Sequence, residues 1–116
     1  MPFHGSCHCG NVVFSVDAEL PSQALSCNCS QCRRKGMLLA FFPTDKFTLD
    51  SGEASLRSYK FNTHRIEHRF CADCGTQPFA IAVSPDGTPT RAVNLRCVPD
   101  IDLNALELQH YNGAAV

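Results

Sequence analysis

Short stretches of apolar residues, each ended by turn residues, follow one another along most of the chain. Residues 12–16 are rich in β-branched and aromatic side chains and come after a Cys-Gly-Asn turn, which predicts a strand following a hairpin. The apolar run at residues 37–42 predicts a buried strand that Pro43 ends. The same kind of pattern predicts further strands at residues 44–49, 55–61, 64–70, 79–83 and 91–97. The chain is therefore predicted to be mainly β.

Helical patterns are few and short. Residues 30–36 and residues 102–108 are the segments that favour short helical turns. A tight turn is predicted at residues 84–87, because the proline of Ser-Pro-Asp-Gly presets φ and its glycine accepts a positive φ.

The size and the charge of the chain limit the class of protein that it represents. With 116 residues, the chain is expected to form one domain over residues 1–116. Ten basic against eleven acidic residues give a net charge of −1, which argues against a nucleic-acid partner. The longest apolar run is far shorter than the roughly 20 residues that cross a membrane. Because the N-terminus also has no signal-peptide pattern, we expect no membrane association and a cytoplasmic location.

Cysteine is the unusual residue of this composition. Eight cysteines in 116 residues indicate disulfides, metal ligation or redox chemistry. Metal ligation is favoured, because no export signal points to an oxidising compartment. Seven cysteines fall into three groups, which are Cys7 and Cys9, then Cys27, Cys29 and Cys32, then Cys71 and Cys74. Cysteines one or two residues apart are poorly placed to form a disulfide with each other but well placed to bind one metal ion.

The sizes of these groups predict two zinc sites of different kinds. Structural zinc has four protein ligands, whereas catalytic zinc usually has three and keeps one position open. The two pairs, Cys7, Cys9, Cys71 and Cys74, are therefore assigned to a structural zinc. The remaining group, Cys27, Cys29 and Cys32, is assigned to a second zinc with an open position, at full or partial occupancy.

Other ligand sets remain open at this point. His8 or His64 could close the three-cysteine site, and a distant fourth ligand could come from His64, His68 or His110. The three cysteines and one pair could also share a bridged cluster. A filled second site would favour a non-catalytic zinc-binding interaction module over an enzyme.

Cys97 lies outside the three groups, in the apolar stretch at residues 93–98. It is expected to be a buried free thiol, because free cysteine behaves as a small hydrophobic residue. The alternative is a thiol-redox enzyme that uses Cys97 as its nucleophile. That alternative requires an exposed thiol with a low pKa.

Three motifs carry a resemblance to a known family. They are Gly5-Ser6-Cys7-His8-Cys9-Gly10, then Cys27-Asn28-Cys29-Ser30-Gln31-Cys32-Arg33-Arg34-Lys35-Gly36, then Arg69-Phe70-Cys71-Ala72-Asp73-Cys74-Gly75-Thr76. In this order they resemble the motifs of the glutathione-dependent formaldehyde-activating family, which includes centromere protein V-like proteins. The resemblance covers about residues 4–102. It implies a zinc-binding fold of paired antiparallel sheets, described as a β-tent, with two zinc ions divided as above.

The resemblance also implies an activity. The family is associated with a carbon–sulfur lyase reaction, in which formaldehyde and the glutathione thiol combine reversibly to S-hydroxymethylglutathione. Arg33, Arg34 and Lys35 follow the last cysteine of the second group and are candidates to bind the carboxylates of glutathione. Three thiolates leave a zinc ion with net charge −1, so it would be a weak Lewis acid, which favours a thiol substrate over a zinc-hydroxide hydrolase. His64 and His68 are expected to be structural, or to donate to a zinc thiolate or relay a proton.

Overall fold

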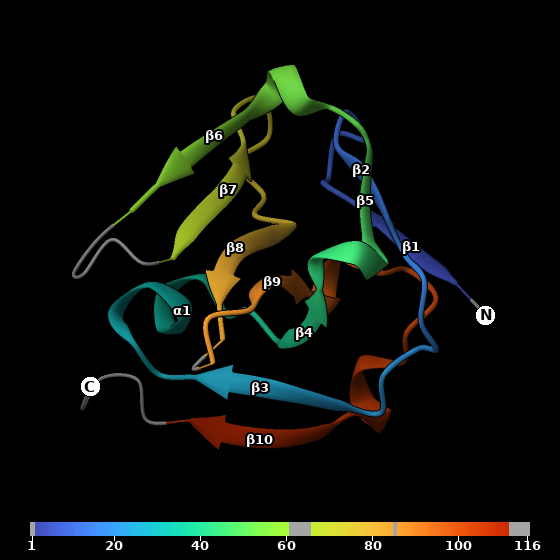
Figure 1. Cartoon of the computed structure of the whole chain (residues 1–116), viewed down its shortest axis with the longest axis vertical. Coiled ribbons are helices and arrows are strands. Elements are labelled where there is room, and N and C mark those ends of the chain that lie inside the picture. The colour runs from blue at the N-terminus through green and yellow to red at the C-terminus, as the bar shows by residue number, and fades with distance from the viewer. Residues whose placement is uncertain (1, 61–65, 85, 112–116) are drawn as a thin grey trace.

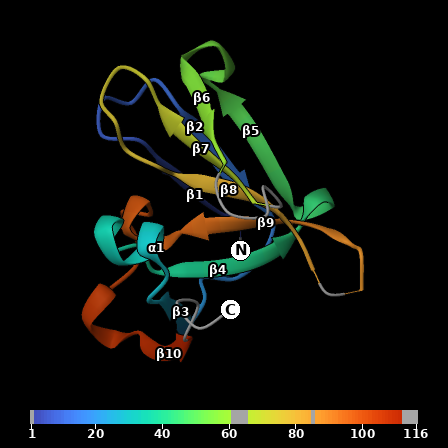
Figure 2. The ribbon, with the colours of Figure 1, turned by 90° about the vertical axis from the view of Figure 1, so that its left-hand side faces the viewer.

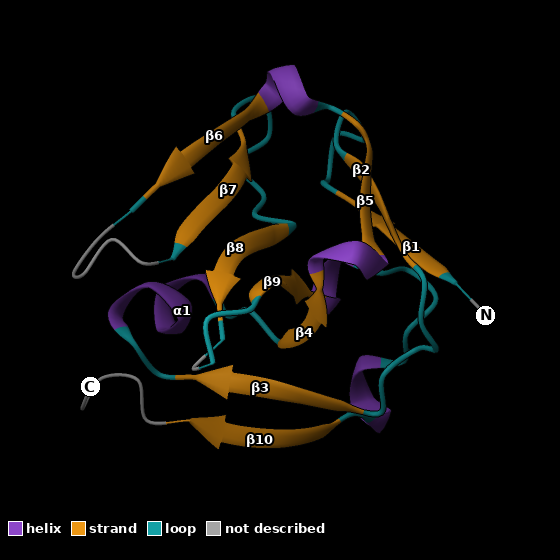
Figure 3. Ribbon diagram, in the orientation of Figure 1, coloured by secondary structure: helices purple, strands orange, loops and turns teal. Residues whose placement is uncertain are grey.

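Ten strands and one short α-helix make up most of the computed structural model, which describes residues 2–60, 66–84 and 86–111. The strands are β1 (Phe3–Ser6), β2 (Val13–Val16), β3 (Gln23–Cys27), β4 (Leu39–Pro43), β5 (Phe47–Ser51), β6 (Leu56–Tyr59), β7 (Glu67–Cys71), β8 (Phe79–Val83), β9 (Pro89–Asn94) and β10 (Glu107–Tyr111). The helical elements are α1 (Ser30–Lys35) and the 3-10 turns η1 (Thr44–Lys46), η2 (Glu53–Ser55), η3 (Leu95–Cys97) and η4 (Leu103–Ala105). A mainly β fold with short helical turns is confirmed (Figure 3).

The strands form two sheets that lean together like the walls of a tent (Figure 1). The smaller sheet has the order β1-β2-β5, and the larger has the order β10-β3-β4-β9-β8-β7-β6. The turn η2 connects the two sheets at the top of the view, and Figure 2 shows the same walls from the side. Neighbouring strands are antiparallel apart from β3 and β10, which are parallel. The expected paired sheets are therefore present, with one parallel pair that was not expected.

Several predicted elements have the predicted extent or nearly so. Strands β2 and β8 and helix α1 lie where the pattern placed them. The strand predicted at residues 37–42 is observed as β4, two residues later at its start. Met37 and Leu38 are buried in the core before the strand begins, and Pro43 is the last residue of the strand. The predicted strand at residues 44–49 begins with η1, so β5 starts only at Phe47.

Other predicted elements are wrong in type or in length. The strand predicted at residues 91–97 ends at Asn94, because the Asn94 side chain accepts a 3.2 Å hydrogen bond from the Arg96 N–H and starts a 3-10 turn. The helix predicted at residues 102–108 is limited to η4, and the chain then enters β10. Of the strand predicted at residues 64–70, the part before residue 66 lies outside the described residues.

The central strands of the larger sheet present two different sides. One row of directly paired residues consists of Phe41, Ala92, Ala80, His68 and Tyr59. Ala80 and Ala92 pack in a buried cluster with Cys32, so this row lies on the side of α1, here called the helix side. The alternate residues lie on the side of the smaller sheet, here called the inter-sheet side, where the Phe79 ring centroid is 4.7 Å from that of Phe47.

No helix in the parts of the chain that the structure describes is long and apolar enough to cross a membrane.

Candidate metal centres

The fold brings seven cysteines together in two groups. The four-cysteine group consists of Cys7, Cys9, Cys71 and Cys74, and the three-cysteine group consists of Cys27, Cys29 and Cys32. Within each group all sulfur atoms lie within 4.8 Å of one another. These are the sets into which the sequence spacing divided the cysteines.

The first half of the four-cysteine group is the turn between β1 and β2. Cys7 follows β1, and its backbone N–H donates a 3.0 Å hydrogen bond to the Val12 carbonyl. The turn closes with a 3.2 Å hydrogen bond from the Gly10 N–H to the Cys7 carbonyl. The Val12 N–H points at the Cys7 sulfur, 3.4 Å away. The tight turn therefore directs Cys7 and Cys9 toward one point, with their sulfur atoms 3.5 Å apart.

The second half is the turn that follows β7. Gly75 has a φ of +81°, and its N–H donates a 2.7 Å hydrogen bond to the Cys71 carbonyl, which folds the chain around the sulfur atoms. The Asn11 side-chain amide donates a 2.9 Å hydrogen bond to the Asp73 carboxylate and joins this turn to the first. The Cys9 and Cys71 sulfur atoms lie 3.7 Å apart across the junction.

This geometry fits a tetrahedral zinc ion. Zn–S bonds of about 2.3 Å in tetrahedral coordination separate neighbouring sulfur atoms by about 3.8 Å. The sulfur atoms of Cys7 and Cys9 are 3.5 Å apart and those of Cys9 and Cys71 are 3.7 Å apart, which is close to this separation. The hydroxyl and the backbone N–H of Thr76 lower the pKa of Cys74 to about 5. Burial opposes ionisation of Cys7, but the Val12 N–H and the neighbouring thiols outweigh it, so the pKa of Cys7 is also lowered. Thiolates, the form in which cysteine binds metal, are therefore favoured here.

The three-cysteine group is built on the start of α1. Cys27 is the last residue of β3, and the Cys29 N–H donates to its sulfur at 3.4 Å. Cys29 is the N-cap of α1, and its sulfur accepts from the Cys32 N–H at 3.4 Å. Gly36 ends the helix with a φ of +67° and donates a 2.9 Å hydrogen bond to the Cys32 carbonyl. Backbone N–H groups thus hold two of the three sulfur atoms in place.

The electrostatics of this group call for a cation. Burial opposes ionisation of Cys29, but the Cys32 N–H and the neighbouring thiols lower its pKa. Burial and the charge of the neighbouring sulfurs raise the pKa of Cys32. Three thiolates so close together would repel one another, and a bound divalent cation would offset that repulsion. The donor set therefore fits a soft metal ion such as zinc, with three protein ligands.

The other ligands considered from sequence do not reach either group among the described residues. Within those residues, no histidine nitrogen or carboxylate joins a group at the 4.8 Å limit. His110 is in register with Ser26, so it projects to the side of the sheet opposite Cys27. His8 is exposed, and His64 lies outside the described residues. The two groups are separate sets, so the bridged cluster is not what the fold builds.

The three basic residues after Cys32 have different surroundings. Lys35 donates a 2.7 Å hydrogen bond to the Gln77 side chain and lies 5.5 Å from the centroid of the Phe70 ring. Arg34 donates to the Ser30 carbonyl of its own helix at 3.0 Å. Arg33 is exposed and lies next to the buried Cys32. Arg33 is therefore the member of this set whose side chain is most readily available to a ligand.

A polar chain that sequence reasoning missed connects α1, which carries Cys32, to β7, which ends at Cys71. Gln77 accepts from Lys35 at its side-chain oxygen, and its side-chain nitrogen lies 3.0 Å from His68 Nδ1. Burial and the charge of Lys35 lower the pKa of His68, and the Gln77 contact opposes this shift only in part. The signal in the sequence was Gln77, a polar residue that stands with Pro78 directly before the apolar strand β8, and it is buried.

Cys97 does not meet the requirement of a redox nucleophile. It lies in η3, half-buried, and its thiol points at the Gln77 carbonyl 3.9 Å away. Burial, together with the nearby Cys7 and Cys74, raises the pKa of Cys97 to about 11. A thiol with this pKa is almost entirely protonated near neutral pH, so the thiol-redox alternative loses its support.

Comparison with known proteins agrees with this architecture. The chain matches a crystal structure of a Rhodobacter sphaeroides protein with a TM-score of 0.80 and 27% sequence identity, covering 93% of this chain and 99% of that one. The family model described as glutathione-dependent formaldehyde-activating enzyme matches residues 2–107. That match spans the β1–β2 turn, α1 and the Cys71–Cys74 turn, and reaches the start of β10. The chain therefore belongs to the glutathione-dependent formaldehyde-activating enzyme family.

Proposed function

We propose that this protein is a zinc-dependent carbon–sulfur lyase that joins formaldehyde reversibly to the thiol of glutathione. The observation that carries the proposal is the three-cysteine group, which gathers three sulfur ligands and, among the described residues, no fourth one. Family membership supplies the candidate substrates. A filled four-ligand site would instead support the interaction module, whose site would have no position for a substrate thiol.

The reaction is an addition that needs no oxidant or reductant. The sulfur of glutathione forms a bond to the carbonyl carbon, the π bond between the carbonyl carbon and oxygen breaks, and the thiol proton ends on that oxygen, which becomes a hydroxyl. The reverse reaction breaks the same carbon–sulfur bond. Zinc held by Cys27, Cys29 and Cys32 would supply an open coordination position that accepts a thiol and lowers its pKa.

The side of the sheet that carries the three cysteines also presents exposed aromatic residues. Ala80 and Ala92 pack beside Cys32 in a buried cluster. The same cross-strand row ends in Phe41 and Tyr59, which are 50% and 48% exposed on the helix side. Exposed aromatic rings on the side of the cysteines offer apolar contact to the body of a bound peptide.

Charge complementarity supports a role for Arg33. Glutathione carries two carboxylates, and an arginine can bind a carboxylate through two parallel hydrogen bonds. Arg33 is exposed and next to Cys32, whereas Lys35 is already held by Gln77 and Phe70. We assign Arg33 to a carboxylate of glutathione and Lys35 to positioning α1, while Arg34 remains a weaker candidate.

The remaining parts of the proposal follow from the same chemistry. The four-cysteine group would bind a structural zinc and hold the two sheets together where they meet. Residues 1–116 would form one domain around the two zinc sites. A cytoplasmic location would keep the seven grouped thiols reduced, as metal binding requires.

Exchange spectroscopy by NMR tests the activity, because it measures interconversion of glutathione and S-hydroxymethylglutathione at equilibrium. The zinc-loaded protein should accelerate this exchange, and Cys29→Ser should abolish the acceleration. Arg33→Gln should raise KM for glutathione about tenfold with little change in kcat, as expected for loss of a charge-assisted hydrogen bond. The matched control is Arg57→Gln, since Arg57 is exposed and donates to the carbonyls of Ala54 and Leu56. An exchange rate equal to the uncatalysed rate would refute the proposal.

A further inference from the structure

A pocket lies on the inter-sheet side of the larger sheet, which is the side opposite the three-cysteine group. It is a pocket of about 320 Å³, within the size range of small-molecule sites. The lining residues come from both walls of the tent and from η2, and they are Phe47, Leu49, Glu53, Arg69, Phe79, Ile81 and Arg91. Because Ile81 and Arg91 are one position along from Ala80 and Ala92, they project away from the cysteines.

The apolar part of the pocket is incompletely covered. Phe47, Leu49 and Ile81 are half-buried, and they pack against the buried Phe79. These side chains therefore expose apolar surface where the two sheets diverge. A ligand with an apolar body would remove that surface from water.

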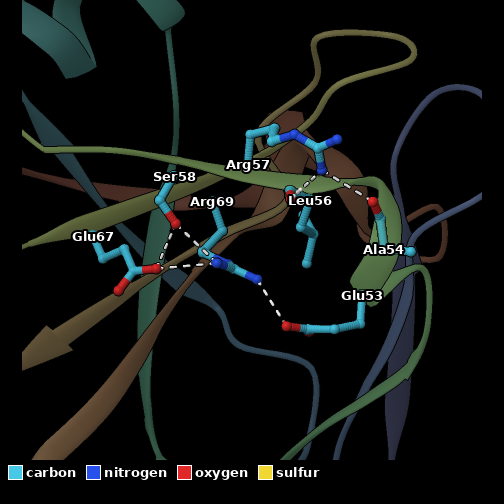
Figure 4. A network of polar contacts seen from close by, with 7 residues as sticks. All are labelled: Glu53, Ala54, Leu56, Arg57, Ser58, Glu67 and Arg69. Atoms are coloured by element: carbon cyan, nitrogen blue, oxygen red, sulfur yellow. Dashed lines mark hydrogen bonds and ion pairs between the residues drawn. The ribbon is translucent and has the colours of Figure 1, made fainter.

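The two arginines of the pocket differ in their partners. Arg69 is held at both ends, by Glu53 at 3.1 Å and by Glu67 at 3.0 Å, with the Ser58 hydroxyl at 2.8 Å (Figure 4). Arg91 contacts the Thr44 hydroxyl and the Thr90 carbonyl, both at 3.4 Å. In the described residues, no carboxylate forms an ion pair with Arg91.

The charges on the lining favour one negative charge in the ligand. Arg69 is already paired with two carboxylates, those of Glu53 and Glu67. Arg91 is the lining cation that forms no ion pair among the described residues. A monoanion would pair with Arg91 alone, whereas a dianion such as a phosphate monoester would bring a second charge close to Glu53 with no free cation to match it.

We propose that this pocket binds a small monocarboxylate with an apolar body, its carboxylate on Arg91 and its body against Phe47 and Ile81. A planar guanidinium suits a carboxylate, because two of its N–H groups can donate to the two oxygens. Binding here is independent of the thiol chemistry, which lies on the helix side of the same sheet.

Octanoate is the probe, titrated into the zinc-loaded, ¹⁵N-labelled full chain. Saturable shifts are expected for the amides of Phe47, Leu49, Ile81 and Arg91, with the amides of α1 unchanged. Arg91→Gln should weaken binding at least tenfold, and Arg57→Gln should not change it. Octanamide, which has the same body without the charge, should also bind at least tenfold more weakly than octanoate.

Each result decides the proposal. Unaltered metal content and unfolding temperature would show that Arg91→Gln is folded, and octanamide tests the charge without changing the protein. Shifts that do not saturate, shifts located away from the pocket, or equal affinities for octanoate and octanamide would overturn the assignment. Competition between octanoate and glutathione would also overturn it, because it would place the carboxylate on the helix side.

Discussion

Lys35 Nζ lies 2.7 Å from the side-chain oxygen of Gln77, and this contact joins the helix of the three-cysteine group to the segment after the Cys71–Cys74 turn. It also orients the Gln77 amide. Because Lys35 only donates, the amide oxygen must face it, and the amide nitrogen then faces His68 Nδ1 at 3.0 Å. Helix α1 and strand β7 are therefore linked through one polar chain with a defined direction.

The tautomer of His68 is the first prediction. An amide nitrogen only donates, so His68 Nδ1 accepts and the proton of the neutral ring is on Nε2. Long-range ¹H–¹⁵N NMR at neutral pH should show this tautomer, and Gln77→Leu should allow both. A ring protonated on Nδ1 in the unmodified protein would contradict the polar chain.

The titration of His68 gives a pH dependence. Its pKa is lowered in the folded protein, chiefly by burial, so the unfolded chain binds a proton more readily. Stability should therefore fall as pH decreases below the unfolded value of about 6.5. The free energy of unfolding, measured with denaturant across this pH range, should depend less on pH in His68→Asn than in the unmodified protein. His110→Asn is the control, because His110 is exposed. Equal pH dependence in the unmodified protein and His68→Asn would contradict this role.

The hydrogen bond between Asn11 and Asp73 should stabilise the junction of the two cysteine turns. It is exposed, so we expect Asn11→Ala and Asp73→Ala each to cost about 0.5–1 kcal/mol of unfolding free energy. The double variant should cost less than the sum of the single ones, since both remove the same interaction. Asn104→Ala, at an exposed site remote in sequence, serves as the control. Strict additivity would indicate that the contact contributes nothing.

Arg69 and Arg57 should differ sharply in their contribution to stability. The Arg69 side chain is 16% exposed and binds two carboxylates, so Arg69→Met leaves those carboxylates without their cation and should cost about 2 kcal/mol. Arg57 is exposed and binds backbone carbonyls, so Arg57→Met should cost less than about 0.5 kcal/mol (Figure 4). Equal losses of unfolding free energy in the two variants would show that the ion pairs of Arg69 are not stabilising.

Cys97 should react slowly and with a steep pH dependence. Burial raises its pKa to about 11, so the thiolate fraction should increase about tenfold per pH unit between neutral pH and pH 10. Iodoacetamide alkylation of the zinc-loaded protein, with Cys97→Ala as reference, measures this rate. A rate that levels off near pH 8 or 9 would contradict the raised pKa, and lost lyase activity in Cys97→Ala would reopen the redox alternative.

The sequence predicted the cysteine groups because their ligands are local. Cys27, Cys29 and Cys32 lie at the end of β3 and the start of α1, so their separation already limits where the sulfur atoms point. Only the pairing of Cys7 and Cys9 with Cys71 and Cys74 depends on contacts between distant segments. It could still be predicted, because a structural zinc ion needs four protein ligands. The strongly apolar β8 was likewise visible in the pattern.

The missed features depend on contacts between distant segments. Strand β10 has five exposed residues and reads as helix or loop in isolation, and it becomes a strand because it pairs in parallel with β3. Gln77 has its role because the fold brings it next to Lys35 of α1, which is 42 residues away along the chain. Arg91 became a candidate only when the second sheet closed the other wall of its pocket. The pattern of apolar and polar residues within one segment does not show which distant segments it will contact.

The central claim is that the two cysteine groups hold two metal ions with different roles. Zinc content by mass spectrometry, measured together with calorimetric glutathione titration on anaerobically purified protein and its Cys29→Ser variant, tests it most directly. We expect two zinc ions per chain in the unmodified protein, and one zinc ion with no glutathione binding in the folded variant. A single zinc ion unaffected by Cys29→Ser, or undiminished glutathione binding in that variant, would contradict the claim.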